Sequence, residues 1–293
     1  MKKAFLQLHT SVFLAGFTGV LGRLITLNEG LLVWWRLLLT AATMWVLFLI
    51  TKQIQKVSVR HIWQLSGIGL MAALHWVTFY GSIKAANVSV ALVCFSAVGF
   101  FTSITEPLLE KKPIDFKEVI LGVLVIAGIS IIFHFDGRYK TGIILGVLCA
   151  LFLAFVMVLL RRFLKIYNSA TVLTYQLTGG FLWLSLLLPL YLFYFPVTTI
   201  LPGWQNLGWL LFLSWVCSVL AFMLTGNALK KLSAYTVNLS FNLEPLYGIL
   251  LAFLLYNEQL ELGFSFYAGA SLILLSVVLH SIIVWRRAKH YKS

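Results

Sequence analysis

Glu244, in the stretch "SFNLEPLYGILL", is an acidic residue surrounded in sequence by apolar ones, and this makes it the first candidate for a functional role. It lies in the middle of an apolar run that starts near Ala234 and ends near Tyr256. A charged group at the centre of a membrane-spanning helix costs about 2.5–3.5 kcal/mol on insertion scales, so Glu244 is expected to face protein or a wet cavity. Pro245 removes a backbone donor and frees a carbonyl one turn back, near Phe241. The pattern predicts a mid-membrane site where Glu244 binds a substrate or a proton, and a neutral carboxyl that bonds a neighbouring helix is the alternative.

Other polar side chains accompany Glu244 on the same run. Asn238 and Asn242 are one helical turn apart, so they share a face. Glu244 lies about 200° round the helix from Asn242, nearer to Ser240 and Tyr247. A helix that is polar on more than one side is expected to be buried among other helices. We therefore count Asn238, Asn242 and Tyr247 as candidate substrate-binding residues, with hydrogen bonding between helices as the alternative for the asparagines.

An aromatic and polar stripe runs along the third apolar run. His75, Phe79 and Ser82 follow helical i, i+4, i+7 spacing, and Trp76 and Tyr80 lie beside them. Aromatic side chains with one polar group are suited to line a cavity for organic substrates. The stripe predicts His75, Trp76 and Tyr80 as substrate-binding residues, and an ordinary packed helix that ends in an interfacial tyrosine is the alternative.

Two further charged residues lie nearer the ends of apolar runs. Glu106 is close to the end of its run, where it can reach the interface or pair with Lys111 or Lys112. It is a candidate gate or substrate-binding residue. Arg36 lies about 10 Å inside the outer face, and its long side chain is expected to reach the interface and anchor the helix there.

The elements that must position these side chains are membrane spans. Of the 293 residues, 61% are hydrophobic and 11% are charged, and the mean hydropathy is +0.96. Soluble domains carry about 25% charged residues, so the composition predicts a multi-pass membrane protein. The net charge of +13 does not indicate nucleic-acid binding, because the basic residues form short clusters between apolar runs.

Ten runs have the roughly 20 apolar residues that a spanning helix needs. Backbone groups in the hydrocarbon must bond within their own segment, so the predicted fold is all-α, and the alternation of a β-barrel is absent from the sequence. The expected spans are residues 4–23, 30–51, 62–83, 88–109, 116–135, 141–161, 169–194, 206–228, 234–256 and 263–285.

The distribution of lysine and arginine predicts the orientation. With the N-terminus in the cytoplasm, 17 of these residues fall in inside segments and 4 fall in outside loops. Cytoplasmic loops carry the excess of lysine and arginine, so both termini are expected to be cytoplasmic. The expected location is a cell membrane, in particular a bacterial inner membrane.

The second half of the chain repeats the first. "SIKAANVSVALVCFSAVGFFTSITEPLL" from Ser82 aligns without gaps on "ALKKLSAYTVNLSFNLEPLYGILLAFLL" from Ala228. The two predicted units are residues 1–138 and 139–293, with five spans each. An odd number of spans reverses the direction of the chain, so the units must be inverted relative to each other. Inverted repeats with a site between them near the midplane are a transporter architecture.

Four stretches carry a resemblance to a known family. They are "SIKAANVSVAL", "NALKKLSAYTVNL", "LEPLYGILLAFLLYNEQL" and "TVLTYQLTGG". The chain resembles the EamA family of the drug/metabolite transporter superfamily over nearly its whole length. The resemblance implies ten helices in two inverted bundles, and a central cavity lined mainly by the third, fourth, eighth and ninth spans. It also implies export of amino acids, other metabolites or drugs. The first repeat departs from the family pattern, since Glu106 and Pro107 stand where the second has Ala252 and Phe253.

The expected function is secondary-active export of a small organic metabolite, amino acid-like or drug-like, by alternating access. No ATP-binding motif is present, so an ion or substrate gradient would supply the energy. We expect no enzyme activity, cofactor or metal. The expected partners are a small-molecule substrate, the lipid bilayer and, as an alternative ligand, a proton; the oligomeric state is left open. The alternative class is a membrane-embedded enzyme or structural subunit, and an enzyme would need clustered catalytic groups.

Overall fold

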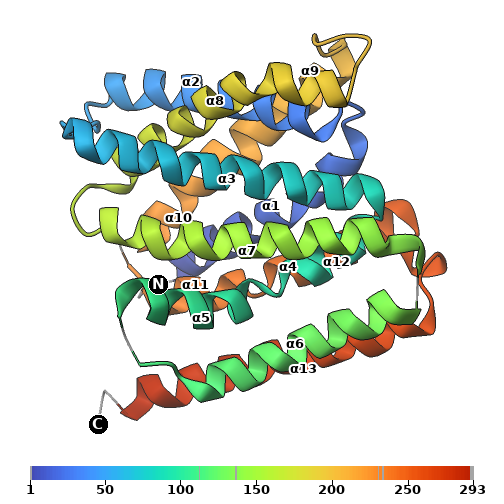
Figure 1. Ribbon diagram of the computed structural model, residues 1–293. Helices are drawn as coiled ribbons and strands as arrows, with labels where there is room; N and C mark the ends of the chain where they lie inside the picture. Colours follow the sequence, from blue (N-terminus) through green and yellow to red (C-terminus); the bar gives the residue numbers. More distant parts are fainter. Residues whose placement is uncertain (1, 112, 136, 230, 233, 291–293) are drawn as a thin grey trace.

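The computed structural model describes residues 2–111, 113–135, 137–229, 231–232 and 234–290, and in them the fold is entirely helical (Figure 1). The predicted spans correspond to ten helical segments, of which seven are continuous. The continuous ones are α1 (Lys2–Leu24), α2 (Glu29–Ile50), α3 (Val59–Ala85), α6 (Phe116–Phe135), α7 (Lys140–Phe163), α8 (Ser169–Tyr194) and α13 (Phe264–His290). Eight segments of the described chain are long and apolar enough to cross a membrane, and two shorter apolar helices lie within α12 and α13.

Three spans are interrupted. The fourth consists of α4 (Val88–Phe95) and α5 (Val98–Glu110), and the ninth of α11 (Ala234–Phe241) and α12 (Glu244–Tyr256). The eighth consists of α9 (Trp204–Ser214), a π-helical turn η2 (Trp215–Leu220) and α10 (Ala221–Leu229). Two short 3₁₀ turns, η1 (Gly137–Tyr139) and η3 (Glu258–Leu260), lie in connections. Interrupted helices are tolerated at membrane depth where protein or a wet cavity surrounds them.

The interruptions occur at equivalent places in the two halves. The alignment that places Ser82 on Ala228 also pairs the last residues of α4 and α11, Phe95 and Phe241. It pairs the residues that end α5 and α12 as well, since Lys111 and Asn257 both have the left-handed conformation, with φ of 54° and 53°. The repeat read from the sequence is thus confirmed in the secondary structure.

Helix packing repeats in the same way. The first helix of the second half, α7, packs on α3 and α5 of the first half, and the equivalent contacts are those of α1 with α10 and α12 of the second half. The packing of α3 on α8 has its counterpart in the packing of α2 on α9. The fifth and tenth spans, α6 and α13, pack on each other and form a separate layer beside the main body (Figure 1). Contacts that recur with exchanged partners are consistent with two inverted repeats.

Glycines let two of these crossings bring backbones into contact. A Cβ added at Gly69 on α3 would overlap the Gln176 carbonyl oxygen, and one added at Gly180 on α8 would lie 2.6 Å from the Gly69 carbonyl oxygen. Between α6 and α13, Gly128 and Gly269 face each other in the same manner. The hydrophobic effect does not drive helix association inside a membrane. Small residues stabilise such crossings instead, because they allow the helices to pack closely.

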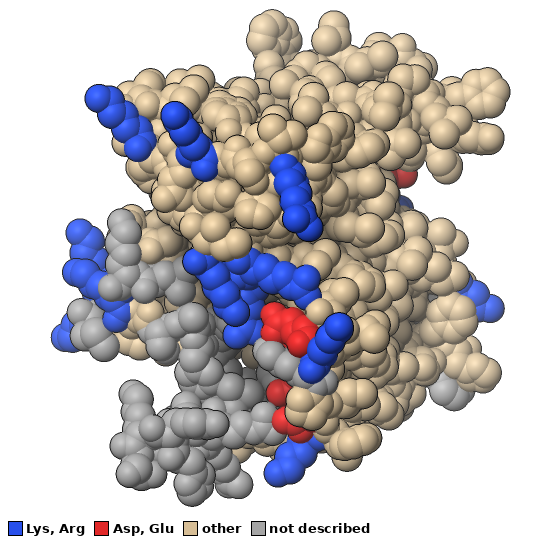
Figure 2. All heavy atoms as spheres, turned by 60° about the vertical axis from the view of Figure 1, so that its left-hand side comes forward, with Lys and Arg blue, Asp and Glu red and all other residues tan. Residues whose placement is uncertain are grey.

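Basic side chains gather at one end of the helices, which we call the basic end. It holds the start of α1 and the connections from α2 to α3, α5 to α6 and α7 to α8. Hydrogen bonds from Asn168 to Gln55, and from Arg161 to Glu106, tie these segments together. Figure 2 shows lysine and arginine spread over this end, with acidic residues between them. The other end of the helices is called the opposite end below.

Candidate functional site

Arg36 on α2 is buried at the centre of the molecule, with only 4% of its surface exposed. Its Nη1 donates to the Tyr80 hydroxyl at 2.7 Å, and its Nη2 donates to Ser218 Oγ at 3.1 Å. The guanidinium also lies 4.2 Å from the centre of the Trp76 ring. The prediction that Arg36 reaches the interface is therefore wrong, because neighbouring helices supply polar and aromatic partners that stabilise the charge inside the protein.

Local helix geometry places these partners. Trp76 and Tyr80 are one turn apart on α3, so both rings project towards α2. Ser218 belongs to the π-helical turn, and its hydroxyl donates to the Leu213 carbonyl, five residues earlier, at 3.1 Å. The wider turn allows Oγ to accept from Arg36 at the same time. Such π-turns in α-helices occur frequently at functional sites.

Glu244 is the first residue of α12 and follows directly on the interruption of the ninth span. Its backbone is held by α1, since a Cβ added at Gly16 would lie 2.9 Å from the Glu244 carbonyl oxygen. The residue is half-buried, and among the described residues none forms a hydrogen bond or ion pair with its carboxyl. Its carboxyl lies within electrostatic range of the Arg36 guanidinium on α2 and of the Cys149 thiol on α7. Glu244 thus lies inside the helix assembly, and the described residues leave the hydrogen-bonding capacity of its carboxyl unused.

His75 on α3 packs against the neighbouring helices α7 and α4. It is buried, and its Nδ1 lies 3.0 Å from the Cys149 carbonyl oxygen on α7. Its ring stacks on Phe79, at 6.4 Å between centres, and lies 5.9 Å from the ring of Phe95 on α4. The imidazole is therefore adjacent to Cys149, which is one of the electrostatic neighbours of Glu244.

The remaining candidates of the ninth span are less closely connected. Asn242 lies in the interruption and is half-buried, and Tyr247 is half-buried with its ring edge-on to Phe13 of α1, at 6.1 Å. The side chain of Asn238 lies outside the described part of the chain. The structure brings Arg36, Trp76, Tyr80 and Ser218 together, and we call these four residues the central cluster. His75 and Glu244 lie nearby. Substrate binding by any of these residues stays a prediction.

Glu106 lies away from this cluster, at the basic end. Its carboxylate pairs with Arg161 of α7 at 2.9 Å, and both side chains are partly exposed. The sequence suggested Lys111 or Lys112 as partners, and Lys112 lies outside the described residues. The pair joins the first half of the chain to the second, so a gating role for Glu106 remains a prediction.

The opposite end is closed by a second contact between the halves, centred on Glu258. This side chain is fully buried, and one of its carboxylate oxygens pairs with Arg23 Nη1 at 2.7 Å. The carboxylate also accepts from the backbone N–H groups of Val88 and Ser89, at 3.0 and 2.8 Å, and from Ser89 Oγ at 2.6 Å. Glu258 from the second half therefore caps the first turn of α4 in the first half.

Two members of the central cluster were missed by sequence reasoning. Arg36 carried a signal, because it is the one lysine or arginine that lies more than two residues inside a predicted apolar run. Ser218 carried none, since only the π-helical turn directs its hydroxyl towards Arg36. Within the described residues no group of three or more His, Cys, Asp or Glu side chains is placed to hold a metal ion.

Two equivalent five-span halves, interrupted helices and buried ionisable side chains between the halves define the architecture of a membrane transporter. Comparison with known families agrees: residues 2–134 and 140–282 match the EamA-like transporter family. The chain belongs to this family, and the resemblance noted in the sequence is confirmed.

The other comparisons add the fold alone. Among curated proteins, none matches. A solved structure, described only as the crystal structure of a protein, is 14% identical in sequence with a TM-score of 0.62. The match covers 96% of this chain and 98% of the other.

Proposed function

We propose that this protein is a secondary-active transporter that moves a small zwitterionic metabolite, of the amino-acid type, by alternating access through a central cavity. The observation that carries the proposal is the placement of Arg36 and Glu244. They are opposite charges within electrostatic reach of each other, and they do not form a direct ion pair. A substrate with one ammonium and one carboxylate group matches this arrangement.

The two side chains have binding capacity left for such a substrate. Arg36 Nε is buried and has no hydrogen-bond partner among the described residues, although the two terminal nitrogens have theirs. The guanidinium would take the carboxylate of the substrate, and the Glu244 carboxylate would take the ammonium. Each charged group of the substrate would then pair with an opposite charge of the protein in a low-dielectric region. This pairing offsets the cost of removing the guanidinium, the ammonium and the two carboxylates from water.

The two residues come from different halves of the chain, and this arrangement suits alternating access. Arg36 belongs to the first half of the chain and Glu244 to the second, so a bound zwitterion would bridge the two repeats. Rocking of one repeat against the other around the substrate would open the site to each side in turn. A proton on Glu244 is the alternative ligand on the return step, since protonation neutralises the carboxylate when the ammonium is absent.

The distribution of charge supports an orientation. We place the basic end in the cytoplasm, because cytoplasmic loops carry the excess of lysine and arginine. Both termini would then be cytoplasmic, in the inner membrane of a bacterial cell, and the Arg23–Glu258 contact would lie at the outer end. An ion or substrate gradient would drive export.

The test is counterflow in proteoliposomes with substrates that differ in one charged group. A panel of zwitterionic amino acids is compared with the amine that lacks the carboxylate and the acid that lacks the ammonium. Trans-stimulated uptake of at least one amino acid, and little uptake of its two single-charge analogues, is expected. Equal transport of the amine and the amino acid would contradict the role of Arg36. The alternative, a membrane enzyme or structural subunit, would give no flux for any compound, and family membership favours the transporter.

A further inference from the structure

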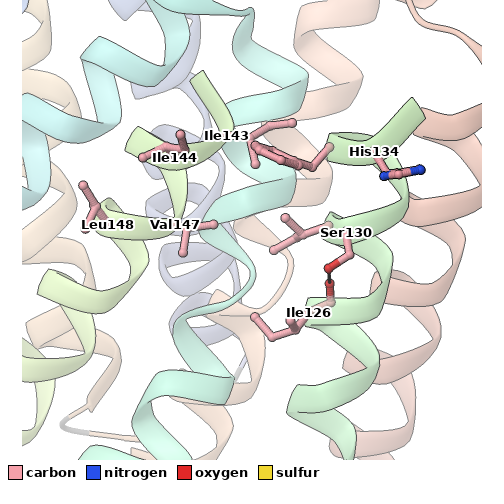
Figure 3. Close-up of a pocket in the computed structure, with 9 residues that line it drawn as sticks. Ile126, Ser130, His134, Ile143, Ile144, Val147 and Leu148 are labelled. Carbon is pink, nitrogen blue, oxygen red and sulfur yellow. Dashed lines mark hydrogen bonds between the residues drawn. The ribbon is translucent and has the colours of Figure 1, made fainter. Parts of the chain in front are cut away.

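A groove of about 580 Å³ lies between α6 and α7, away from the central cluster (Figure 3). Clefts that hold small molecules have volumes of about 300–1,000 Å³. The walls are formed mainly by branched apolar side chains, among them Ile126 and Ile129 on α6 and Ile144 and Leu148 on α7. The groove marks the seam where the layer of α6 and α13 meets the main body.

The groove opens towards the hydrocarbon of the bilayer. Ile144 is 53% exposed and Leu148 is 38% exposed, and both lie on a helix apolar enough to cross a membrane. The hydroxyl of Ser130 donates to the Ile126 carbonyl of its own helix at 2.8 Å, so it adds little polarity to the wall. The surroundings therefore suit an alkyl chain.

The length of the groove corresponds to one leaflet. From Ile126 to His134 on α6 the wall extends about 12 Å at 1.5 Å per residue. Half of the roughly 30 Å hydrocarbon core is about 15 Å. His134 stands at the end of the groove near the turn from α6 to α7, which belongs to the opposite end of the molecule (Figure 3). A chain of one leaflet would enter beside this turn.

The turn places positive charge where the headgroup of such a lipid would lie. Its sequence, "FDGRYK", contains two cations and one acid. The Nζ of Lys140 lies 5.8 Å from the centre of the Phe133 ring, and Phe133 lines the groove. Arg138 donates to the Glu261 carbonyl oxygen, which leaves Lys140, an exposed residue, as the cation beside the entrance. Lysine near a membrane surface attracts anionic headgroups.

We propose that this groove binds one phospholipid with an anionic headgroup, with an acyl chain between α6 and α7 and the phosphate at Lys140. The lipid completes the packing of the seam, where α6 makes few contacts with α7 and is held to the main body mainly through α5. The site is independent of substrate transport, so its test does not rest on flux.

The experiment measures retained lipid. The full chain is reconstituted in vesicles that contain equal amounts of phosphatidylglycerol and phosphatidylcholine, extracted in detergent, washed, and analysed by native mass spectrometry. Ile144→Trp fills the groove from an exposed position. The matched control is Leu186→Trp, on α8, where the side chain is 68% exposed outside the groove. Lys140→Gln removes only the charge.

The wild type and Leu186→Trp are expected to retain one phospholipid per chain, with phosphatidylglycerol preferred, and Ile144→Trp is expected to lose it. Lys140→Gln should keep a lipid but lose about five-fold in the preference for phosphatidylglycerol, as expected for one lysine at a membrane surface. Equal retention by Ile144→Trp and Leu186→Trp would overturn the site. An unchanged preference in Lys140→Gln would overturn the placement of the headgroup.

Discussion

Replacing Glu258 with alanine should destabilise the protein far more than its position near a helix end suggests. The wild-type carboxylate is fully buried and joins Arg23 to the first turn of α4. Glu258→Ala leaves two backbone N–H groups and the Ser89 hydroxyl without their acceptor, and it leaves Arg23 without its buried partner. The perturbation thus removes four short hydrogen bonds to one carboxylate.

The magnitude follows from burial. Each buried donor left unpaired costs about 1–3 kcal/mol, and three such donors lose their acceptor. Arg23 adds less, because its side chain is 36% exposed and water can solvate the charge. These contributions overlap, so we expect a loss of about 3–5 kcal/mol in the free energy of unfolding. The neighbouring Glu261 provides the control, because its side chain is half-exposed and its carboxylate lies 3.9 Å from Arg23 Nη2, a longer and weaker ion pair. Glu261→Ala should cost at most about 1 kcal/mol.

The protein carries its own reporter for this comparison. Cys94, Cys149 and Cys217 are free and buried, so a thiol-reactive dye labels them only when the helices separate. In a thermal ramp with such a dye, the midpoint for Glu258→Ala should fall several-fold further below the wild type than the midpoint for Glu261→Ala. Similar midpoints for the two variants would refute the reasoning that Glu258 holds the two halves together.

Three further predictions concern packing, orientation and the aromatic stripe. Gly69→Leu should disrupt the α3–α8 crossing and lower the yield of folded protein in a size-exclusion profile, whereas Gly67→Leu, where an added Cβ meets nothing within 4 Å, should not. A cysteine at Gly203, also in open space, should react with a membrane-impermeant reagent from outside the cell, and labelling only from the inside would contradict the orientation. His75→Ala should reduce counterflow of the identified substrate more than it lowers the midpoint of unfolding, and full transport activity would remove His75 from the site.

Much of the fold was predictable because membrane spans are long and uniform. The seven continuous helices correspond to predicted runs with ends that differ by a few residues, and hydropathy alone carries this information. The gapless alignment of residues 82–109 on residues 228–255, with five spans in each unit, also predicted an inverted repeat. The boundary between the units, at residues 138 and 139, stays a prediction.

The interruptions of the helices were only partly predictable. Pro245 signalled the one between α11 and α12, because proline removes a backbone donor. The equivalent interruption after Phe95 contains no proline, and the first glycine beyond it is Gly99. The local sequence therefore gives no proline or glycine signal for this interruption.

The central cluster was predictable by residue type but not by contact. A carboxyl at mid-membrane was expected to be buried, and Glu244 is found inside the helix assembly. The opposite charge was misplaced, because the depth of Arg36 along α2 allows its side chain either to reach the interface or to turn inwards. The hydroxyl groups of Tyr80 and Ser218, on two other helices, determine the inward direction.

The measurement that tests the central proposal most directly is counterflow of the identified amino acid by Glu244→Gln. Glutamine keeps the volume and most hydrogen bonding of the side chain and removes the charge. Loss of one partner of a buried charge pair costs about 2–5 kcal/mol, so flux should fall by about tenfold or more at normal membrane expression. The control, Glu118→Gln, changes a carboxyl near the start of α6, at the basic end, and should transport normally. Wild-type flux in Glu244→Gln would show that the carboxylate is a structural element of the helix packing and does not bind the substrate.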